Sequence, residues 1–203
     1  VKYNVLATPS SFNTPMGVTR VIREQLTPAH QVFIAEMGAR HVGDIRELVE
    51  LVHPQMGLIT SVGPQHLDTF GTIERVRDTK YELIEGLPAD GCAFFPNDGA
   101  YTKAMYDKTT CKKYLYTLEG EGDVLAEEVC VSSAGSTFRV VYPGGEFSAT
   151  TQLLGRHNVQ NILGCVAIAL ELGLSAEEIR RGIAKIQPVE HRLQLIQGAG
   201  GVT

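Results

Sequence analysis

The first hundred residues alternate between short apolar runs and longer segments with helical periodicity. The apolar runs predict strands at residues 3–8, 31–36, 56–62 and 92–95. The periodic segments predict helices at residues 15–26, 42–53 and 73–85. Strands that alternate with helices favour a mostly parallel sheet flanked by helices and joined by right-handed crossovers. The predicted fold class is therefore α/β.

The pattern changes after about Asp107, where shorter apolar runs are separated by glycine-rich turns. These runs predict strands at residues 113–117, 124–126, 138–142 and 147–153. Pro143-Gly-Gly145 is typical of a hairpin, so we expect a small antiparallel region at about residues 110–153. A long helix is predicted from Asn158 to Leu172, followed by Gly173. The capping box Ser175-Ala-Glu-Glu178 then opens a last helix that reaches about Ile186.

Composition narrows the class of protein. The 203 residues are 43% hydrophobic, which is enough for a full core, and the net charge of −5 with no basic stripe argues against a nucleic-acid binder. No apolar run is long enough to span a membrane, and the start lacks the order of a signal peptide. The four widely spaced cysteines argue against zinc and predict reduced, mostly buried thiols, from which we expect a cytoplasmic protein.

Three residues could bring metal and phosphate chemistry to one rim of the sheet. Glu36 and His66 follow predicted strands, at the edge where open α/β sheets bind ligands. A carboxylate at such a position suits Mg²⁺, although Glu36 could also be a solvated loop acid and His66 a structural histidine. Lys80 lies in the helix 73–85, where most lysines are solvated. If CO₂ carbamylated Lys80, its side chain would become an oxygen ligand.

Polar residues at helix starts and loops form a second set of candidates. Asn13 and Thr14 belong to a hydroxyl- and amide-rich loop that could hold phosphate or simply form a turn. His157 or Asn158 could cap the long helix, with Asn161 one turn on, or these side chains could contact a nucleotide. Arg192, at the start of a predicted final strand, suits phosphate recognition or a surface ion pair.

Taken in order, these segments resemble the ATPase domain of the Mur ligases. The resemblance covers nearly the whole chain. It rests on Ser11-Phe-Asn-Thr-Pro-Met-Gly17, Ala35-Glu-Met-Gly-Ala39, Gly63-Pro-Gln-His-Leu-Asp-Thr-Phe-Gly71, Thr79-Lys-Tyr-Glu-Leu83, Leu154-Gly-Arg-His-Asn-Val-Gln-Asn161 and Glu190-His-Arg-Leu193. Within the family, the second and third of these motifs look most like the members that add D-alanyl-D-alanine to UDP-N-acetylmuramoyl-tripeptide.

The resemblance implies an enzyme that makes an amide bond through an acyl phosphate, with ATP and Mg²⁺. By resemblance, Glu36 would bind the Mg²⁺ between the ATP phosphates, while His66 and carbamylated Lys80 would hold a second Mg²⁺. Asn158 and Asn161, beside His157, would approach the adenine. The remaining roles implied are contact with the nucleotide's phosphates or ribose by Arg192, and with the muramoyl-peptide by Asn13 and Thr14. We expect a monomer.

The chain also departs from the family pattern. It contains no G-x-x-x-x-G-K-[ST] segment, which the resemblance places just upstream of Val1, and it lacks the family's N- and C-terminal domains. We therefore expect residues 1–203 to be a central ATP-binding domain that is inactive alone and binds ATP weakly at best. The alternatives are a sister Mur ligase, a folylpolyglutamate synthase domain, or a non-catalytic binding module.

Overall fold

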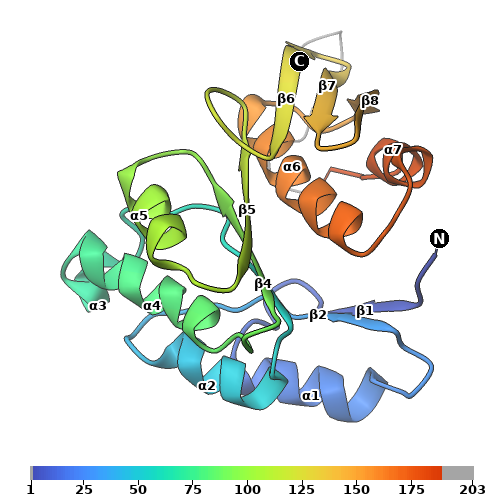
Figure 1. The fold of residues 1–203 in the computed structure, drawn as a ribbon. Helices are drawn as coiled ribbons and strands as arrows, with labels where there is room; N and C mark the ends of the chain where they lie inside the picture. Colours follow the sequence, from blue (N-terminus) through green and yellow to red (C-terminus); the bar gives the residue numbers. More distant parts are fainter. Residues whose placement is uncertain (1, 189–203) are drawn as a thin grey trace, which may run out of the picture. The chain divides into compact units, whose positions relative to one another are not determined.

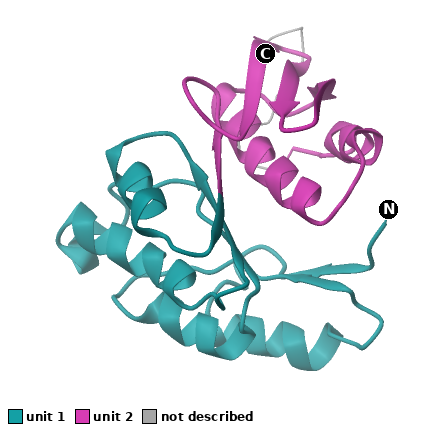
Figure 2. Ribbon diagram, viewed as in Figure 1, with its two compact units in different colours: residues 1–113 teal, residues 114–203 magenta. Residues whose placement is uncertain are grey.

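The computed structural model describes residues 2–188 and divides the chain into two compact units. Figure 2 colours the first unit, residues 1–113, apart from the second, residues 114–203. The helices and strands are labelled in Figure 1. Arg192 and the final strand predicted there lie outside the described residues.

The first unit is built from short parallel strands and the helices that connect them. Its elements are β1 (Val5–Ala7), α1 (Pro15–Gln25), β2 (Val32–Ile34), α2 (Asp44–Val52), β3 (Met56–Leu58), α3 (Leu67–Phe70), α4 (Ile73–Glu85), β4 (Cys92–Pro96) and α5 (Ala100–Lys108). Strand β1 pairs in parallel with β2, and β3 with β4. Parallel pairs linked by helices are what the alternating apolar and periodic segments predicted.

The core of this unit forms where α1, α2 and α4 pack together. Val18, Leu48 and Val49 are buried there, and Leu83 of α4 packs against them. Gly86 ends α4 close to α2, because a Cβ on it would lie 2.2 Å from Val49 Cγ1. Since real Cβ contacts are never that short, only glycine allows this approach without a shift.

The second unit contains two helices and the predicted antiparallel strands, except that the strand predicted at residues 113–117 pairs in parallel. Its elements are β6 (Val124–Ser132), β7 (Gly135–Tyr142), β8 (Gly145–Thr151), α6 (Arg156–Glu171) and α7 (Ala176–Ala184), and β5 (Lys112–Thr117) enters it from the unit boundary. Strand β6 pairs in parallel with β5 and antiparallel with β7, which pairs antiparallel with β8. Helix α6 packs against β6, and α7 against β8. The fold class is α/β, as predicted.

Several elements differ in extent from the sequence prediction. Strand β3 ends at Leu58, whereas the apolar run predicted a strand to residue 62, and β6 and β7 are longer than predicted. The capping box is confirmed, because Ser175 Oγ accepts from Glu178 N while the Glu178 carboxylate accepts from Ser175 N.

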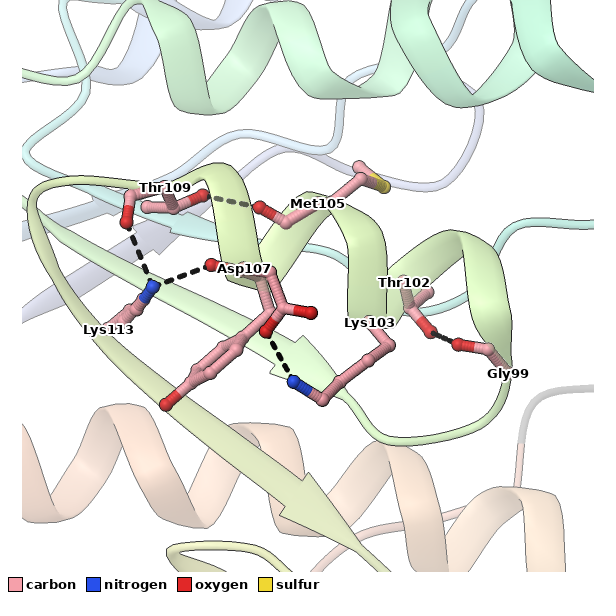
Figure 3. A network of polar contacts seen from close by, with 8 residues as sticks. Gly99, Thr102, Lys103, Met105, Asp107, Thr109 and Lys113 are labelled. Carbon is pink, nitrogen blue, oxygen red and sulfur yellow. Dashed lines mark hydrogen bonds and ion pairs between the residues drawn. The ribbon is translucent and has the colours of Figure 1, made fainter.

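Helices α3 and α5 were not predicted, and polar contacts define the end of α5. Figure 3 shows this network, in which Lys113 Nζ donates to the backbone carbonyls of Tyr106 and Thr109 at 2.7 and 2.9 Å. The hydroxyl of Thr109 also donates to the Met105 carbonyl, at 2.7 Å. Side-chain donors thus add to the backbone capping of α5, in which Thr109 N donates to the Tyr106 carbonyl at 3.1 Å.

The four cysteines are free, as predicted, but their burial differs from the prediction. Cys92 is buried in β4 and Cys111 is half-buried, whereas Cys130 and Cys165 are exposed. The expectation of mostly buried thiols was therefore wrong for these last two, because apolar sequence neighbours do not fix which face a residue occupies. Among residues 2–188, no helix is long and apolar enough to cross a membrane.

Candidate active site

Asn13 and Glu36 are in contact at one edge of the parallel pair β1–β2. Both strands run in the same direction, so the segments that follow them emerge at the same edge. Asn13 Nδ2 donates to Glu36 Oε1 at 3.2 Å, and Gly38 N donates to the Asn13 carbonyl at 2.8 Å. A Cβ on Gly38 would lie 2.9 Å from the Asn13 amide, so the glycine makes room for this contact. Two segments that the sequence singled out separately therefore meet.

Glu36 keeps its carboxylate accessible while its backbone is fixed. The residue is exposed, and its backbone N–H donates to Thr8 Oγ1 at 3.0 Å. A carboxylate has about four acceptor positions, and the amide of Asn13 occupies one of them. The remaining lone pairs suit a hard cation such as Mg²⁺.

Thr14 acts as the N-cap of α1. Its Oγ1 accepts from Gly17 N at 3.3 Å, and Pro15 occupies the first helical position, where a missing N–H costs nothing. The capping role explains why this residue type stands here. The predicted contact between Thr14 and a substrate stays a prediction.

His66 lies at the start of α3 rather than directly after a strand. Because β3 ends at Leu58, residues 59–65 separate it from His66. The His66 backbone is left-handed, with φ of 51°, and its carbonyl accepts from the N–H groups of Thr69 and Phe70 at 3.0 and 2.9 Å. The residue is exposed. Its backbone shapes the turn, and its imidazole is accessible to a ligand.

Lys80 is partly buried on α4, between the buried residues Thr79 and Tyr81. Its side chain makes no hydrogen bond or ion pair with other residues that the structure describes. Burial lowers the pKa of the Lys80 amine below its ordinary value of 10.5. A lysine with a lowered pKa holds more of its neutral amine, which is the nucleophilic form.

The elements that carry His66 and Lys80 are neighbours, because α3 packs against α4. Within residues 2–188, no three His, Cys, Asp or Glu side chains lie close enough to hold a metal ion by themselves. Mg²⁺ does not need such a group, because it commonly binds one or two carboxylates together with substrate phosphates and water.

In the second unit, the start of α6 differs from the prediction that His157 or Asn158 caps it. The N-cap is Gly155, with φ of 90°, and no side chain of the described residues caps it. Asn158 Nδ2 instead donates to the Leu154 carbonyl at 2.8 Å. The imidazole of His157 lies over the loop, since a Cβ on Gly155 would be 3.0 Å from that ring. The capping prediction was wrong because the amide turns back to the preceding loop.

The remaining candidates of this group are less well defined by contacts. His157, Asn158 and Asn161 all stand on the first turns of α6. His157 and Asn161 are exposed, and Asn158 is half-buried. Arg192 lies outside the described residues.

The sequence interpretation passed over two carboxylates that organise the segment after Glu36. Asp44 accepts from backbone N–H groups in the loop before α2, and Glu82 of α4 accepts from backbone N–H groups at the start of α2. The sequence held a signal for Glu82, because it is a charged residue among apolar positions of α4. In the structure this residue is only 5% exposed.

The family model of the Mur ligase middle domain matches residues 1–169. The chain is 32% identical over 193 residues to the UDP-N-acetylmuramoyl-tripeptide--D-alanyl-D-alanine ligase of Haemophilus influenzae, which covers 95% of this chain and 42% of that relative. The chain thus spans less than half the length of this relative.

Solved structures show the same likeness. A crystal structure of MurF from Acinetobacter baumannii superposes with a TM-score of 0.92 at 30% identity, over 98% of this chain and 44% of that one. The structure of MurF ligase from Thermotoga maritima in complex with ADP gives 0.82 at 22% identity, over 93% and 43% of the two chains. With the family model matching residues 1–169, this chain belongs to the Mur ligase middle-domain family.

Proposed function

We propose that this chain is the central ATP-binding part of a ligase that joins D-alanyl-D-alanine to UDP-N-acetylmuramoyl-tripeptide. The observation that carries the proposal is the likeness to ligases named for this reaction, which extends over 95% of the chain at 32% identity. The ADP complex of the Thermotoga maritima relative supports a nucleotide as ligand.

The reaction proposed is a condensation driven by ATP. The tripeptide carboxylate attacks the γ-phosphorus of ATP, which forms an acyl phosphate and releases ADP. The amine of D-alanyl-D-alanine then attacks the acyl carbon, loses a proton, and expels inorganic phosphate. Such transfers depend mainly on positioning and on neutralising charge. Bound Mg²⁺ would neutralise the negative charge on the phosphates.

The residues of the first unit fit this chemistry. Glu36 offers an accessible carboxylate, and Asn13 orients it. The neutral amine of Lys80 can attack CO₂ and lose a proton, giving a carbamate whose oxygens, unlike an ammonium group, suit Mg²⁺. His66 would complete the metal site with Lys80, and Thr14 would face the peptide substrate with Asn13.

The second unit supplies the proposed nucleotide contacts. His157, Asn158 and Asn161 stand at the start of α6, where backbone N–H groups favour polar and anionic ligands. Arg192 would contact the phosphates or ribose. We further propose that the protein acts as a cytoplasmic monomer, and that residues 1–203 alone neither turn over ATP nor bind it tightly.

The test uses the full-length protein that contains this chain. Purified enzyme is incubated with ATP, Mg²⁺, the UDP-linked tripeptide and D-alanyl-D-alanine, and the product is identified by mass together with released phosphate. We expect one phosphate per amide bond, and no phosphate release when either substrate is omitted. Product formation with a different amine would assign a sister reaction, and the absence of any nucleotide-dependent product would favour a binding module.

A further inference from the structure

The segment between Glu36 and α2 is fixed by side chains that accept its backbone N–H groups. Arg40 N and His41 N both donate to Asp44 Oδ2, each at 2.8 Å. Burial raises the pKa of the Asp44 carboxyl, but these two hydrogen bonds and the charge of His41 outweigh it, so the pKa lies below its ordinary value of 3.8. The ionised carboxylate of Asp44, the first residue of α2, therefore holds the loop after Glu36 against the start of that helix.

Glu82 completes the same loop from a different helix. Its Oε1 accepts from Gly43 N at 3.0 Å and its Oε2 accepts from Arg46 N at 2.9 Å. Gly43 is the N-cap of α2 and has no side chain of its own to accept a bond. The cap is thus supplied by α4, and both carboxylate oxygens are used.

The position of Glu82 links two candidate site residues. It follows Lys80 by two positions on α4, and it bonds the end of the loop that begins at Glu36. A carboxylate that is 5% exposed would be unfavourable without such partners, whereas the positive end of α2 favours it. One buried side chain therefore joins the turn of α4 that carries Lys80 to the loop that carries Glu36.

We propose that Glu82 is a positioning residue for the magnesium-nucleotide site. It sets the loop after Glu36 against α4, so that the carboxylate of Glu36 and the side chain of Lys80 keep a fixed separation. This inference rests on the proposed function, since it assumes that Glu36 and Lys80 serve one site. Residues that support metal ligands commonly change metal affinity by about tenfold or more when altered.

The test compares two variants of the full-length protein. In Glu82→Gln, the amide oxygen can accept one N–H, but the amide nitrogen meets the second N–H and that bond is lost. Glu85→Gln is the matched control, because Glu85 is exposed on the same helix and, among residues 2–188, its side chain makes only a long ion pair, 3.9 Å, to Arg46 of α2. Binding of Mg-ADP is measured by calorimetry over a range of Mg²⁺ concentrations, and hydrogen exchange is measured without metal.

We expect Glu82→Gln to raise the Mg²⁺ concentration needed for half-maximal binding about tenfold, with Glu85→Gln unchanged. In the metal-free protein, the amides of Gly43 and Arg46 should exchange faster only in Glu82→Gln. The proposal is wrong if Glu82→Gln binds Mg-ADP with the same Mg²⁺ dependence as the parent. It is also wrong if the variant only contains less folded protein and its folded molecules bind normally, because Glu82 would then have a structural role alone.

Two further measurements keep the outcomes separate. If Glu82→Gln does not fold, Glu82→Asp retains the charge on a shorter side chain, and the same shift in Mg²⁺ dependence is expected; its absence would refute the proposal. If the parent binds Mg-ADP but makes no amide product, the ligase function fails while the Glu82 comparison still stands.

Discussion

The N-terminus of α2 in the first unit is capped by a side chain, whereas the N-terminus of α6 in the second unit has no side-chain cap from the described residues. In the first unit, the start of α2 is occupied by the protein itself, since the Glu82 carboxylate accepts from Gly43 N and Arg46 N. In the second unit, α6 starts at Gly155 with no side-chain cap from the described residues, and Arg156 pairs with Glu119 at 2.7 Å. Equivalent helix ends can serve as an internal anchor or present their N–H groups to other partners.

Among the predicted changes, the largest is the loss of ligase rate on substitution of Lys80, which would show that the first unit contributes to the active site. In the full-length protein, Lys80→Ala should lower the ligase rate by roughly a hundredfold or more, the scale of losing one charge-stabilising group. Lys103→Ala is the control, because Lys103 is an exposed lysine of the same unit that pairs with Asp107. Steady-state rates measure both. Equal rates for parent and Lys80→Ala would remove Lys80 from the site.

Packing provides the next comparison between the units. Gly86→Ala places a Cβ 2.2 Å from Val49 Cγ1, so the free energy of unfolding should fall by about 1–3 kcal/mol. Gly182→Ala, within α7, meets nothing within 4 Å and should raise it by about 0.5–1 kcal/mol. Urea unfolding of both variants measures the difference. If Gly86→Ala were neutral, the close approach of α4 to α2 would be wrong.

A smaller effect is expected at the start of α6. Asn158→Ala removes the hydrogen bond to the Leu154 carbonyl and should cost about 1 kcal/mol of stability. If Asn158 also contacts the nucleotide, ADP affinity should fall by about fivefold to tenfold, the loss of one hydrogen bond. Calorimetry with ADP separates the two effects, and unchanged affinity in the folded variant would leave Asn158 with a structural role only.

The smallest effect is the pH dependence set by Lys80. Its pKa in the folded protein lies below the ordinary value of 10.5, because burial penalises the charged form. Between those two values the unfolded chain binds more protons, so the parent should gain stability as the pH rises through this window. Below this pH window Lys80 is charged in both states, and burial of that charge lowers the free energy of unfolding by a constant amount.

Lys80→Met should therefore be more stable than the parent at neutral pH and should lack this alkaline gain. Thermal unfolding in CO₂-free buffer at several pH values is the measurement, since a carbamate would remove the positive charge. Parallel pH profiles for the parent and the variant would show that Lys80 is solvated.

The elements of the first unit were largely predictable because their signals are local. Pro15, the stripe of Val18 and Val21, and the apolar segment that became β4 all specify structure through neighbours in sequence. The extent of β6 was not predictable, because its second half continues as a strand by pairing with β7. The early end of β3 was not predictable either, and its partner does not set it, because β4 continues to Pro96. The short helix α3 starts with a left-handed His66, which no periodicity announces.

The candidate site was predictable only in part. That Asn13 and Glu36 each follow a strand could be predicted, but their contact was not, because the sequence interpretation grouped Glu36 with His66 and Lys80 and placed Asn13 in a separate loop. The cap on α2 was not predictable, because Glu82 is 39 residues away from Gly43 in sequence. The turn of the Asn158 amide back to Leu154 depends on loop geometry, which a capping pattern does not contain.

The long-range cap also has a consequence for the order of folding. Because 39 residues separate Glu82 from Gly43, their hydrogen bond requires closure of a loop that contains β3 and α3. The first turn of α2 should therefore become protected only when α4 docks, after the local turns of both helices have formed. Pulsed hydrogen exchange during refolding would detect this as late protection of the Gly43 and Arg46 amides, and early protection there would show that α2 completes itself.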